Sequence, residues 1–422
     1  MRMVIDITQL AGWQGKLTGI PRVMYELSTR YAEIGDETVF VGWDAGQRVF
    51  WELSFDEVIR KRKQVDSPEA LGITAEQSIP SLKETMHTMF SKLPQPAKAM
   101  TRQLINMVQR TYTSRKPSME DFKFKEGDTL LVVWGEWGDG SYRQRLVEAV
   151  EKDSVGLYQV VHDMLPLITP QYSSHSTTSL ESYVKEVYPY CRKLISVSQN
   201  TKRDVSQWMT DHNLTAPDIE VIRLGENFEK IQSLKPNDSF FDKKEPYVVC
   251  VGTIETRKNH TLLYYVYKLA KTRNISLPPI VVVGRRGWLT ENIYDLITTD
   301  PETKDKFIFL HNASDEELSW LYKHSLFSIY PSHYEGWGLP VAESIAHGVP
   351  CLSSNTSSMP EIAGDLIPYF TPTSTDECLM AICQLLDEQY LQRAREKIKL
   401  YQPTDWNETF VQIQRIIGDG ND

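Results

Sequence analysis

Short apolar runs rich in β-branched residues recur along this chain in two series, each broken by segments long enough to be helices. The runs lack a clean apolar–polar alternation, which is typical of strands buried on both faces, as in parallel sheets covered by helices. The first series comprises residues 3–8, 38–43, 129–135, 156–162, 193–198 and 220–224, and the second comprises residues 247–252, 280–284, 307–311, 327–331, 349–353 and 367–370. This pattern predicts an α/β chain with two doubly wound, Rossmann-like halves.

Chain length and one polar segment divide these series into domains. At 422 residues the chain is too long for one ordinary core. The polar segment 227–246 is predicted to be a linker. We therefore expect an N-terminal domain over residues 1–235 and a C-terminal domain over residues 245–403, facing a central cleft. Residues 404–422 carry apolar positions at helical spacing and are predicted to form an amphipathic helix.

Composition excludes several classes of function. Hydrophobic content of 41% and charged content of 24% are those of a soluble globular protein, and no apolar run of about 18 residues predicts a transmembrane helix. The chain starts directly with a strand-like run and lacks the apolar core of a signal peptide, so we expect a cytoplasmic protein. The net charge of −10 argues against nonspecific nucleic-acid binding. Five cysteines without metal-type spacing are expected to be free thiols.

An insertion at about residues 52–125 does not fit the two-domain pattern. Its stretch 81–116 contains seven basic residues and one acid, interleaved with apolar positions. Such a basic amphipathic stretch suits an anionic lipid surface and would place the protein on the inner face of the cytoplasmic membrane. The alternative is that its apolar stripe packs on the N-terminal domain and its cations face solvent.

Two carboxylates, Glu335 and Glu343, bracket a glycine-rich turn. An apolar run precedes them, and a helix with Pro340 at its first position is predicted to follow. A loop at the carboxyl end of a strand that opens a helix favours a phosphate. We expect the helix dipole to keep Glu343, in the first helical turn, ionised for hydrogen bonds from a ribose diol, and Glu335 to accept from sugar hydroxyls. The alternative is that both acids are merely solvated.

The local string around these acids, Glu335-Gly-Trp-Gly-Leu-Pro340 with Glu343, resembles the donor-site signature of the retaining glycosyltransferases of family 4. The resemblance covers nearly all of the chain except the insertion. It implies the two-domain GT-B fold, with the final helix crossing back onto the N-terminal domain. It also implies that the residues of the turn bind the donor, namely Gly336, Trp337, Gly338 and Leu339.

A second element of this kind runs from Gly252 and Thr253 to a helix that begins near Asn259. Arg257 and Lys258 stand at the helix entrance, where they can bind a diphosphate and stabilise the charge that grows as the sugar–oxygen bond breaks. The string resembles the family's Gly-Thr-x-Glu-x-Arg-Lys-Asn element, which supports this role. An exposed basic pair at a helix start is the alternative.

His162 and Asp163 follow a strand of the N-terminal domain, where open sheets bind ligands. The family places a histidine here against the donor sugar, and His162 resembles it, with Asp163 as an orienting or acceptor-side group. A structural histidine is the alternative. We also expect Glu136 and Trp137 on the acceptor side, because tryptophan stacks on sugar faces, although a core tryptophan fits the sequence equally well.

The loop after the first strand, from Gly12 to Arg22, resembles the family's Thr-Gly-Ile-Gly-Arg element except that Pro21 replaces the second glycine. Glycine allows the backbone to approach a phosphate or sugar closely. Proline removes an N–H group, so Gly19 is the residue of this loop that we expect to bind the donor.

The resemblance implies transfer of a sugar from a nucleotide diphosphate donor to a glycan or lipid-linked glycan, with retained configuration. His162, Arg257, Lys258 and Glu335 are the expected catalytic residues. No Asp-x-Asp motif or ligand cluster predicts a metal, and no cofactor is expected. The motifs are similar to those of bacterial mannosyl- and rhamnosyltransferases of surface-polysaccharide synthesis, which favours a GDP-sugar over a UDP-sugar. The rival interpretations are a pyridoxal-dependent glycan phosphorylase and a non-catalytic scaffold of a polysaccharide assembly complex.

Overall fold

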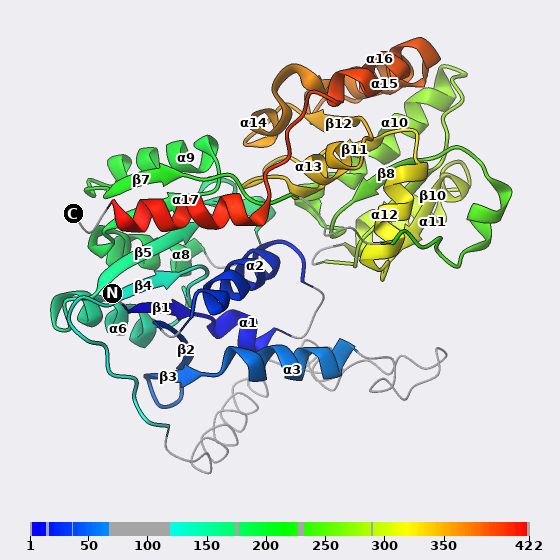
Figure 1. Cartoon of the computed structure of the whole chain (residues 1–422). Helices are drawn as coiled ribbons and strands as arrows, with labels where there is room; N and C mark the ends of the chain where they lie inside the picture. The colour runs from blue at the N-terminus through cyan, green and yellow to red at the C-terminus, as the bar shows by residue number, and fades with distance from the viewer. Residues whose placement is uncertain are drawn as a thin grey trace, which may run out of the picture.

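The computed structural model describes residues 2–13, 17–35, 37–66, 119–173, 177–226, 232–287 and 290–419. These residues form two α/β domains, one built by the first half of the chain and one by the second (Figure 1). The predicted basic stretch 81–116 lies outside the described residues. Within the described part of the chain, no helix has both the length and the apolar character needed to span a membrane.

The N-terminal domain contains a seven-stranded sheet in the order β3-β2-β1-β4-β5-β6-β7. All neighbouring pairs are parallel except β2 and β3. The strands are β1 (Met3–Asp6), β2 (Thr38–Asp44), β3 (Val49–Leu53), β4 (Thr129–Val132), β5 (Gly156–Val161), β6 (Lys193–Ser196) and β7 (Asp218–Val221). β1, β4 and β5 are buried along their whole length, which explains their continuous apolar sequences.

The C-terminal domain contains a six-stranded parallel sheet in the order β10-β9-β8-β11-β12-β13. Its strands are β8 (Val248–Val251), β9 (Ile280–Val283), β10 (Phe307–Leu310), β11 (Ser328–Tyr330), β12 (Cys351–Ser354) and β13 (Tyr369–Phe370). In both sheets the chain runs outward from a central strand, returns, and fills the other side, so each domain is doubly wound as predicted.

Helices cover both sheets (Figure 1). Those of the N-terminal domain are α1 (Thr8–Gly12), α2 (Ile20–Glu33), α3 (Phe55–Asp66), α6 (Gly140–Glu151), α7 (Leu165–Ile168), α8 (Thr177–Glu186) and α9 (Gln199–Asp211). Those that follow the linker are α10 (His260–Thr272), α11 (Glu291–Thr299), α12 (Asp315–His324), α13 (Leu339–Ala346), α14 (Met359–Ala363), α15 (Thr375–Leu386), α16 (Glu388–Ile398) and α17 (Trp406–Gly418). Short 3₁₀ turns include η1 (Pro170–Tyr172), η2 (Tyr188–Tyr190), η3 (Ser239–Lys243), η4 (Thr256–Lys258), η5 (Lys304–Lys306) and η6 (Gly364–Leu366).

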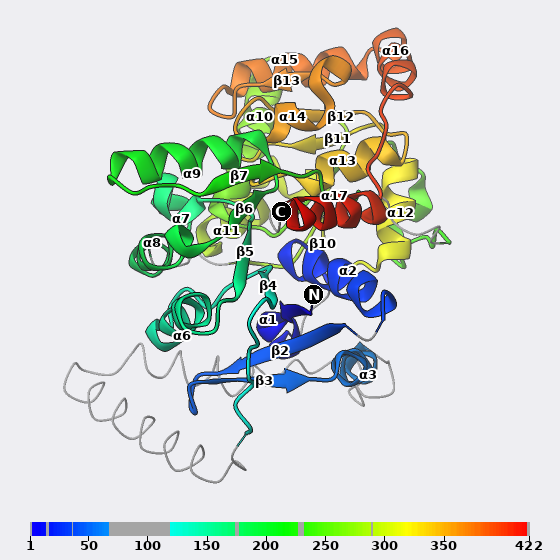
Figure 2. The same cartoon turned by 60° about the vertical axis from the view of Figure 1, so that its left-hand side comes forward.

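The last helix, α17, lies on the N-terminal domain beside α2 (Figures 1 and 2). Trp406 packs on the backbone of Gly225 so closely that a Cβ atom there would lie 2.3 Å from its indole. The hydroxyl of Thr409 donates to the carbonyl of Arg223 at 2.8 Å. α17 therefore ties the end of the chain to the segment that leaves β7.

β3 was not expected from the sequence. It pairs antiparallel with β2 at the edge of the sheet, and its outer face is only partly buried. A short turn with Arg48 at φ 59° joins the two strands. Glu52, which is exposed, interrupts the apolar residues of the strand, so β3 lacks the continuous apolar run that marks the buried strands. The predicted insertion therefore begins after β3, with α3.

The two domains make direct contacts. The carboxylate of Glu361, in α14, accepts the backbone N–H groups of Gln199 and Asn200, each at 2.7 Å, at the start of α9. The ring of Tyr172 stacks on that of His333 at 4.8 Å. Since the first amides of a helix have no intrahelical partner and form its positive end, Glu361 caps a helix that belongs to the other domain.

Candidate functional site

The loop between β11 and α13 is held against the N-terminal domain. A Cβ atom on Gly336 would lie 1.9 Å from the carbonyl oxygen of His162 and 3.2 Å from Cβ of Asp163. Only glycine fits at this position, because the two backbones touch. The structure thus brings together two motifs that lie more than 170 positions apart in the sequence.

Glu335 lies at the centre of a charged cluster inside this loop. Its Oε1 atom is 2.6 Å from Nη1 of Arg257 and 2.7 Å from Nζ of Lys258. The hydroxyl of Ser332 donates to the same oxygen at 2.6 Å. Burial alone would raise the pKa of Glu335, but the two cations lower it to about 2. Glu335 is therefore a carboxylate at neutral pH.

The two predicted diphosphate-binding cations sit in η4, just before α10. Nη2 of Arg257 pairs with Glu255 at 2.6 Å, and its pKa is raised because Glu335 and Glu255 outweigh burial. Burial lowers the pKa of Lys258, although Glu335 opposes that shift. The ammonium of Lys258 also donates to the hydroxyl of Tyr330. Both cations are thus held by protein partners at the place where the sequence predicted a phosphate.

Gly252 shapes the approach to this cluster. Its φ of 150° is unfavourable for other residues, and a Cβ atom there would touch the stem of Lys258 at 3.4 Å. The neighbouring Thr253 is exposed, and its methyl group lies 2.8 Å from the position that a Cβ atom on Gly287 would occupy. The amide side chain of Asn259 donates to the carbonyls of Pro331 and Pro372, which fixes the end of β11 beside η4.

Glu343 differs from its predicted state. It lies in the second turn of α13, since the helix begins at Leu339 and Pro340 is its second residue. Burial raises the pKa of Glu343 to about 7, although Arg22 opposes the shift. The prediction that the helix dipole keeps this acid ionised was therefore wrong, because a dipole acts mainly within the first turn and burial dominates here.

The closest cation to Glu343 that the structure records comes from the N-terminal domain. Nη1 of Arg22, in the first turn of α2, lies 3.7 Å from Oε1 of Glu343. The sequence pattern pointed to the loop that ends at Arg22, but Gly19 was the residue predicted to bind the donor. Gly19 is the exposed N-cap of α2, with φ 58°. Arg22 could have been selected from the sequence because a cation in the first turn of a helix is disfavoured by the helix dipole, and such an unfavourable position can indicate a functional role.

His162 is half buried, and its Nε2 lies 3.0 Å from the carbonyl oxygen of Val133. That nitrogen therefore carries a proton. Burial lowers the pKa of His162 to about 4, so the ring is neutral at physiological pH. Asp163 accepts the backbone N–H of Leu165 at 2.9 Å and so supports the turn into α7.

The other predicted residues divide between packing and polar contacts. The indole of Trp337 is buried in an apolar cluster shared by both domains, beneath the guanidinium of Arg223. Leu339 packs against the same cluster, and Gly338, at φ 114°, is the N-cap of α13. Trp137 is partly buried against the second core of the N-terminal domain.

Glu136 accepts a hydrogen bond from the amide of Gln9 at 2.7 Å. Burial and the nearby carboxylates Asp6 and Asp139 raise its pKa. It lies after β4, close in sequence to Val133, whose carbonyl holds His162.

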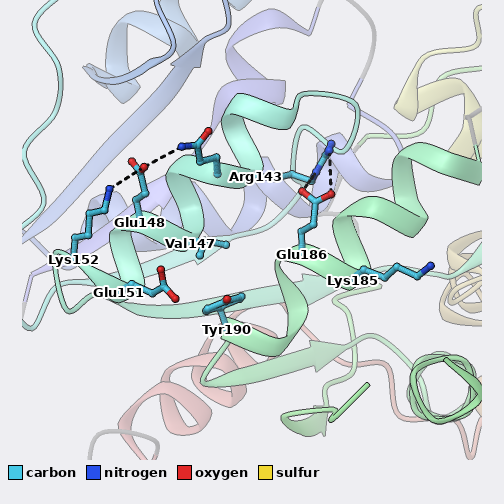
Figure 3. Close-up of a pocket in the computed structure, with 9 residues that line it drawn as sticks. Arg143, Val147, Glu148, Glu151, Lys152, Lys185, Glu186 and Tyr190 are labelled. Carbon is cyan, nitrogen blue, oxygen red and sulfur yellow. Dashed lines mark hydrogen bonds and ion pairs between the residues drawn. The ribbon is translucent and has the colours of Figure 1, made fainter. Parts of the chain in front are cut away.

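A cavity of about 480 Å³ lies elsewhere, between α6, α8 and η2 (Figure 3). Paired charges line it, including Arg143 with Glu186 at 2.7 Å and Lys152 with Glu148 at 3.0 Å. It contains none of the residues predicted from the sequence.

Part of the chain matches the model of a known protein family. Residues 232–402, which include Arg257, Lys258, Glu335 and Glu343, match the model of the family described as glycosyl transferases group 1. The C-terminal part of the chain is thus similar to the group 1 glycosyl transferases. The C-terminal domain holds most of the candidate site, and the N-terminal domain adds the turn at His162 and the guanidinium of Arg22.

The curated relatives are longer than the matched region. The O-antigen chain mannosyltransferase B of Escherichia coli is 34% identical over 143 residues, which are 34% of this chain and 37% of the relative. The O-antigen chain mannosyltransferase RfbU of Salmonella typhimurium is 27% identical over 223 residues, 50% of this chain and 56% of the relative. The matched part of the chain thus spans between a third and about half of these proteins.

Solved structures identify the fold. HepE of Anabaena, in complex with UDP and glucose, superposes with a TM-score of 0.63 at 14% identity, over 99% of this chain and 100% of that chain. A sucrose-phosphate synthase of Thermosynechococcus elongatus gives a TM-score of 0.62 at 15% identity, over 99% of both chains. The predicted GT-B fold is thereby confirmed.

Proposed function

We propose that this chain is a glycosyltransferase that moves a hexose from a nucleotide diphosphate sugar to a glycan or lipid-linked glycan in bacterial surface-polysaccharide synthesis. The observation that carries the proposal is the cluster of Glu335, Arg257 and Lys258 at the carboxyl ends of buried strands. Gly336, the residue after Glu335, touches the turn that carries His162. The named relatives, which are O-antigen mannosyltransferases, support mannose or a deoxyhexose as the sugar. A GDP-sugar is the proposed donor, with a UDP-sugar as the alternative.

The cluster supports a division of roles. Arg257, Lys258 and Ser332 all contact Oε1 of Glu335. A carboxylate also has a second oxygen, which can accept a hydrogen bond from a sugar hydroxyl. Arg257 and Lys258 supply positive charge where the diphosphate leaves, and this charge is worth most in a water-poor site. Neutral His162 can offer its Nδ1 lone pair to the sugar.

We propose retention of configuration by attack on the face from which the diphosphate departs. The acceptor oxygen forms a bond to the anomeric carbon as the sugar–phosphate bond breaks, and its proton passes to the departing phosphate oxygen. Glu335 cannot be a general acid, because its pKa lies at about 2. The positive charge of Arg257 and Lys258 makes a metal unnecessary in this scheme.

Thermal-shift measurements with GDP, UDP, CDP and ADP, followed by hydrolysis of the matching donor sugars, test the proposal directly. We expect GDP to raise the melting temperature most, since ligand binding stabilises the folded state by mass action. A chain that no nucleoside diphosphate stabilises at millimolar concentration would not be such a transferase.

A lipid-linked acceptor would require access to a membrane surface, and residues 81–116 remain the predicted contact. Flotation with liposomes of anionic and neutral lipid tests this part separately. Binding only to anionic liposomes at low salt is expected, and equal absence of binding to both would remove the membrane contact from the proposal.

A further inference from the structure

We propose that Arg22 is a positioning residue of the nucleotide site: its guanidinium, contributed by the N-terminal domain, holds the carboxylate of Glu343 ready to accept a ribose diol. The inference rests on the proposed function, because it takes Glu343 as the ribose-binding acid. It adds a residue of the first domain to a site that otherwise belongs to the second.

The first argument for this role is the distance between the side chains of Arg22 and Glu343. Nη1 of Arg22 and Oε1 of Glu343 are 3.7 Å apart, and the side chains are only 15% and 10% exposed. This separation allows a strong charge interaction but exceeds the length of a hydrogen bond. The carboxylate thus gains the electrostatic benefit of a cation without using its lone pairs on it. Glu335, by contrast, is bonded at 2.6 and 2.7 Å.

The second argument for this role is the position of Arg22 in α2. Arg22 follows Ile20 and Pro21 in the first turn, where the helix dipole opposes a positive charge. Its intrahelical partner Glu26 is 4.0 Å away. A residue that breaks a local preference of this kind is expected where function requires it. The N-cap Gly19, with φ 58°, sets the start of α2.

The surroundings of Glu343 leave Arg22 as its main cationic support. The groups that act on Glu343 come from several elements: Arg22 on α2, Glu226 after β7, Asp315 and Tyr322 on α12, and Lys258 in η4. Asp315 and Glu226 oppose ionisation, and Lys258 favours it while it pairs with Glu335. On its own helix, the backbone carbonyl of Glu343 accepts from Nδ1 of His347. Removal of Arg22 should therefore make Glu343 harder to ionise.

Nucleotide affinity measured across pH 6 to 9 tests this role. We expect affinity for GDP, or for the diphosphate that stabilises the chain best, to rise with a midpoint near 7, where Glu343 ionises. In Arg22→Ala the midpoint should move about one pH unit upward, as for loss of a nearby opposite charge. Affinity should fall about fivefold at pH 7 and by less than twofold at pH 9. Arg22→Lys should keep the wild-type midpoint.

Arg30→Ala is the matched control, because Arg30 lies on the same helix and pairs with Glu26 at 2.8 Å. It should leave the midpoint unchanged. A ¹³C titration of Glu343 in the nucleotide-free protein, assigned by comparison with Glu343→Gln, gives a second readout that needs no ligand. An unchanged Glu343 titration in Arg22→Ala would overturn the inference. If the wild-type protein bound no nucleotide, the proposed function itself would be wrong. If Arg22→Ala bound nucleotide with an unchanged midpoint, only the role of Arg22 would be wrong.

Discussion

Glu335 and Glu343 lie eight positions apart, and each is 8% exposed, yet the structure gives them opposite properties. The cations of η4 lower the pKa of Glu335 to about 2, whereas burial raises the pKa of Glu343 to about 7. The two side chains are equally buried, so burial does not explain the difference in pKa. The difference comes from the neighbouring cations: Glu335 has two within 2.7 Å, and Glu343 has one at 3.7 Å.

This comparison suggests a division of labour. A carboxylate locked between cations keeps its charge and geometry under all ordinary conditions, which suits a group beside the reacting sugar. A carboxylate that titrates near neutrality binds best only when it is ionised. We therefore expect loss of Glu335 to damage the fold and the chemistry, and changes at Glu343 to adjust nucleotide affinity.

The largest effect is expected from Glu335→Ala. The substitution leaves Arg257 and Lys258 buried without their shared partner, which typically costs about 3–5 kcal/mol of unfolding free energy. Glu343→Gln, at the same depth, should change stability by less than about 1 kcal/mol at pH 7. Denaturant titration measures both.

The double variant Glu335→Ala/Lys258→Ala serves as a control for this interpretation. It should lose less stability than the sum of the single variants, because it removes one of the orphaned cations. Additive losses would show that the ion pair does not couple the two residues.

Turnover should fall at least about tenfold in Lys258→Ala, since this ammonium is proposed to stabilise the leaving diphosphate. Lys271→Ala removes the same charge from the outer face of the adjacent helix, where Lys271 pairs with Glu302 at 2.8 Å, and should keep wild-type turnover. Steady-state kinetics with the preferred donor measures the turnover of both variants. Equal rates would remove Lys258 from the mechanism.

The sequence predicted the fold well because the buried parallel strands are continuous apolar runs. It missed the edge strand β3, in which the exposed Glu52 interrupts the apolar residues. In the candidate site it selected Glu335, Arg257 and Lys258, which the structure joins directly. Their grouping follows from strand ends that meet at one edge of a sheet.

The sequence did not predict which partner each acid would meet. Glu343 was assigned to the helix dipole, but its pKa is set by burial and by charges on other elements, including Arg22 on α2, which lies more than 300 positions away in the sequence. Arg22 was passed over because its role depends on a contact between domains. Such contacts leave little trace in a local pattern, so the charge state of Glu343 could be judged only from the structure.

A moderate effect is expected for Glu343→Gln, whose amide has no charge to titrate. Wild-type nucleotide affinity should rise about tenfold between pH 6 and pH 8, as Glu343 passes from mostly protonated to mostly ionised. The variant should bind more weakly at pH 8 and show a nearly flat profile. Isothermal titration calorimetry at several pH values measures this, and a variant as pH-dependent as the wild type would assign the titration to another group.

The smallest effect concerns stability without ligand. An acid whose pKa is raised by folding contributes stability that is full below its unfolded value near 4.5 and is lost as pH rises through the folded value, here about 7. Glu335 has the opposite sign: its contribution is present above about 4.5 and is lost as pH falls toward 2. Between pH 6 and 8, wild-type protein should therefore lose more melting temperature than Glu343→Gln, by a few degrees at most. Other titrating groups are common to both proteins and cancel in this difference. If the melting temperatures of both proteins changed equally with pH, Glu343 would not titrate near neutrality. Its carboxylate would then be stabilised by its partners, as that of Glu335 is.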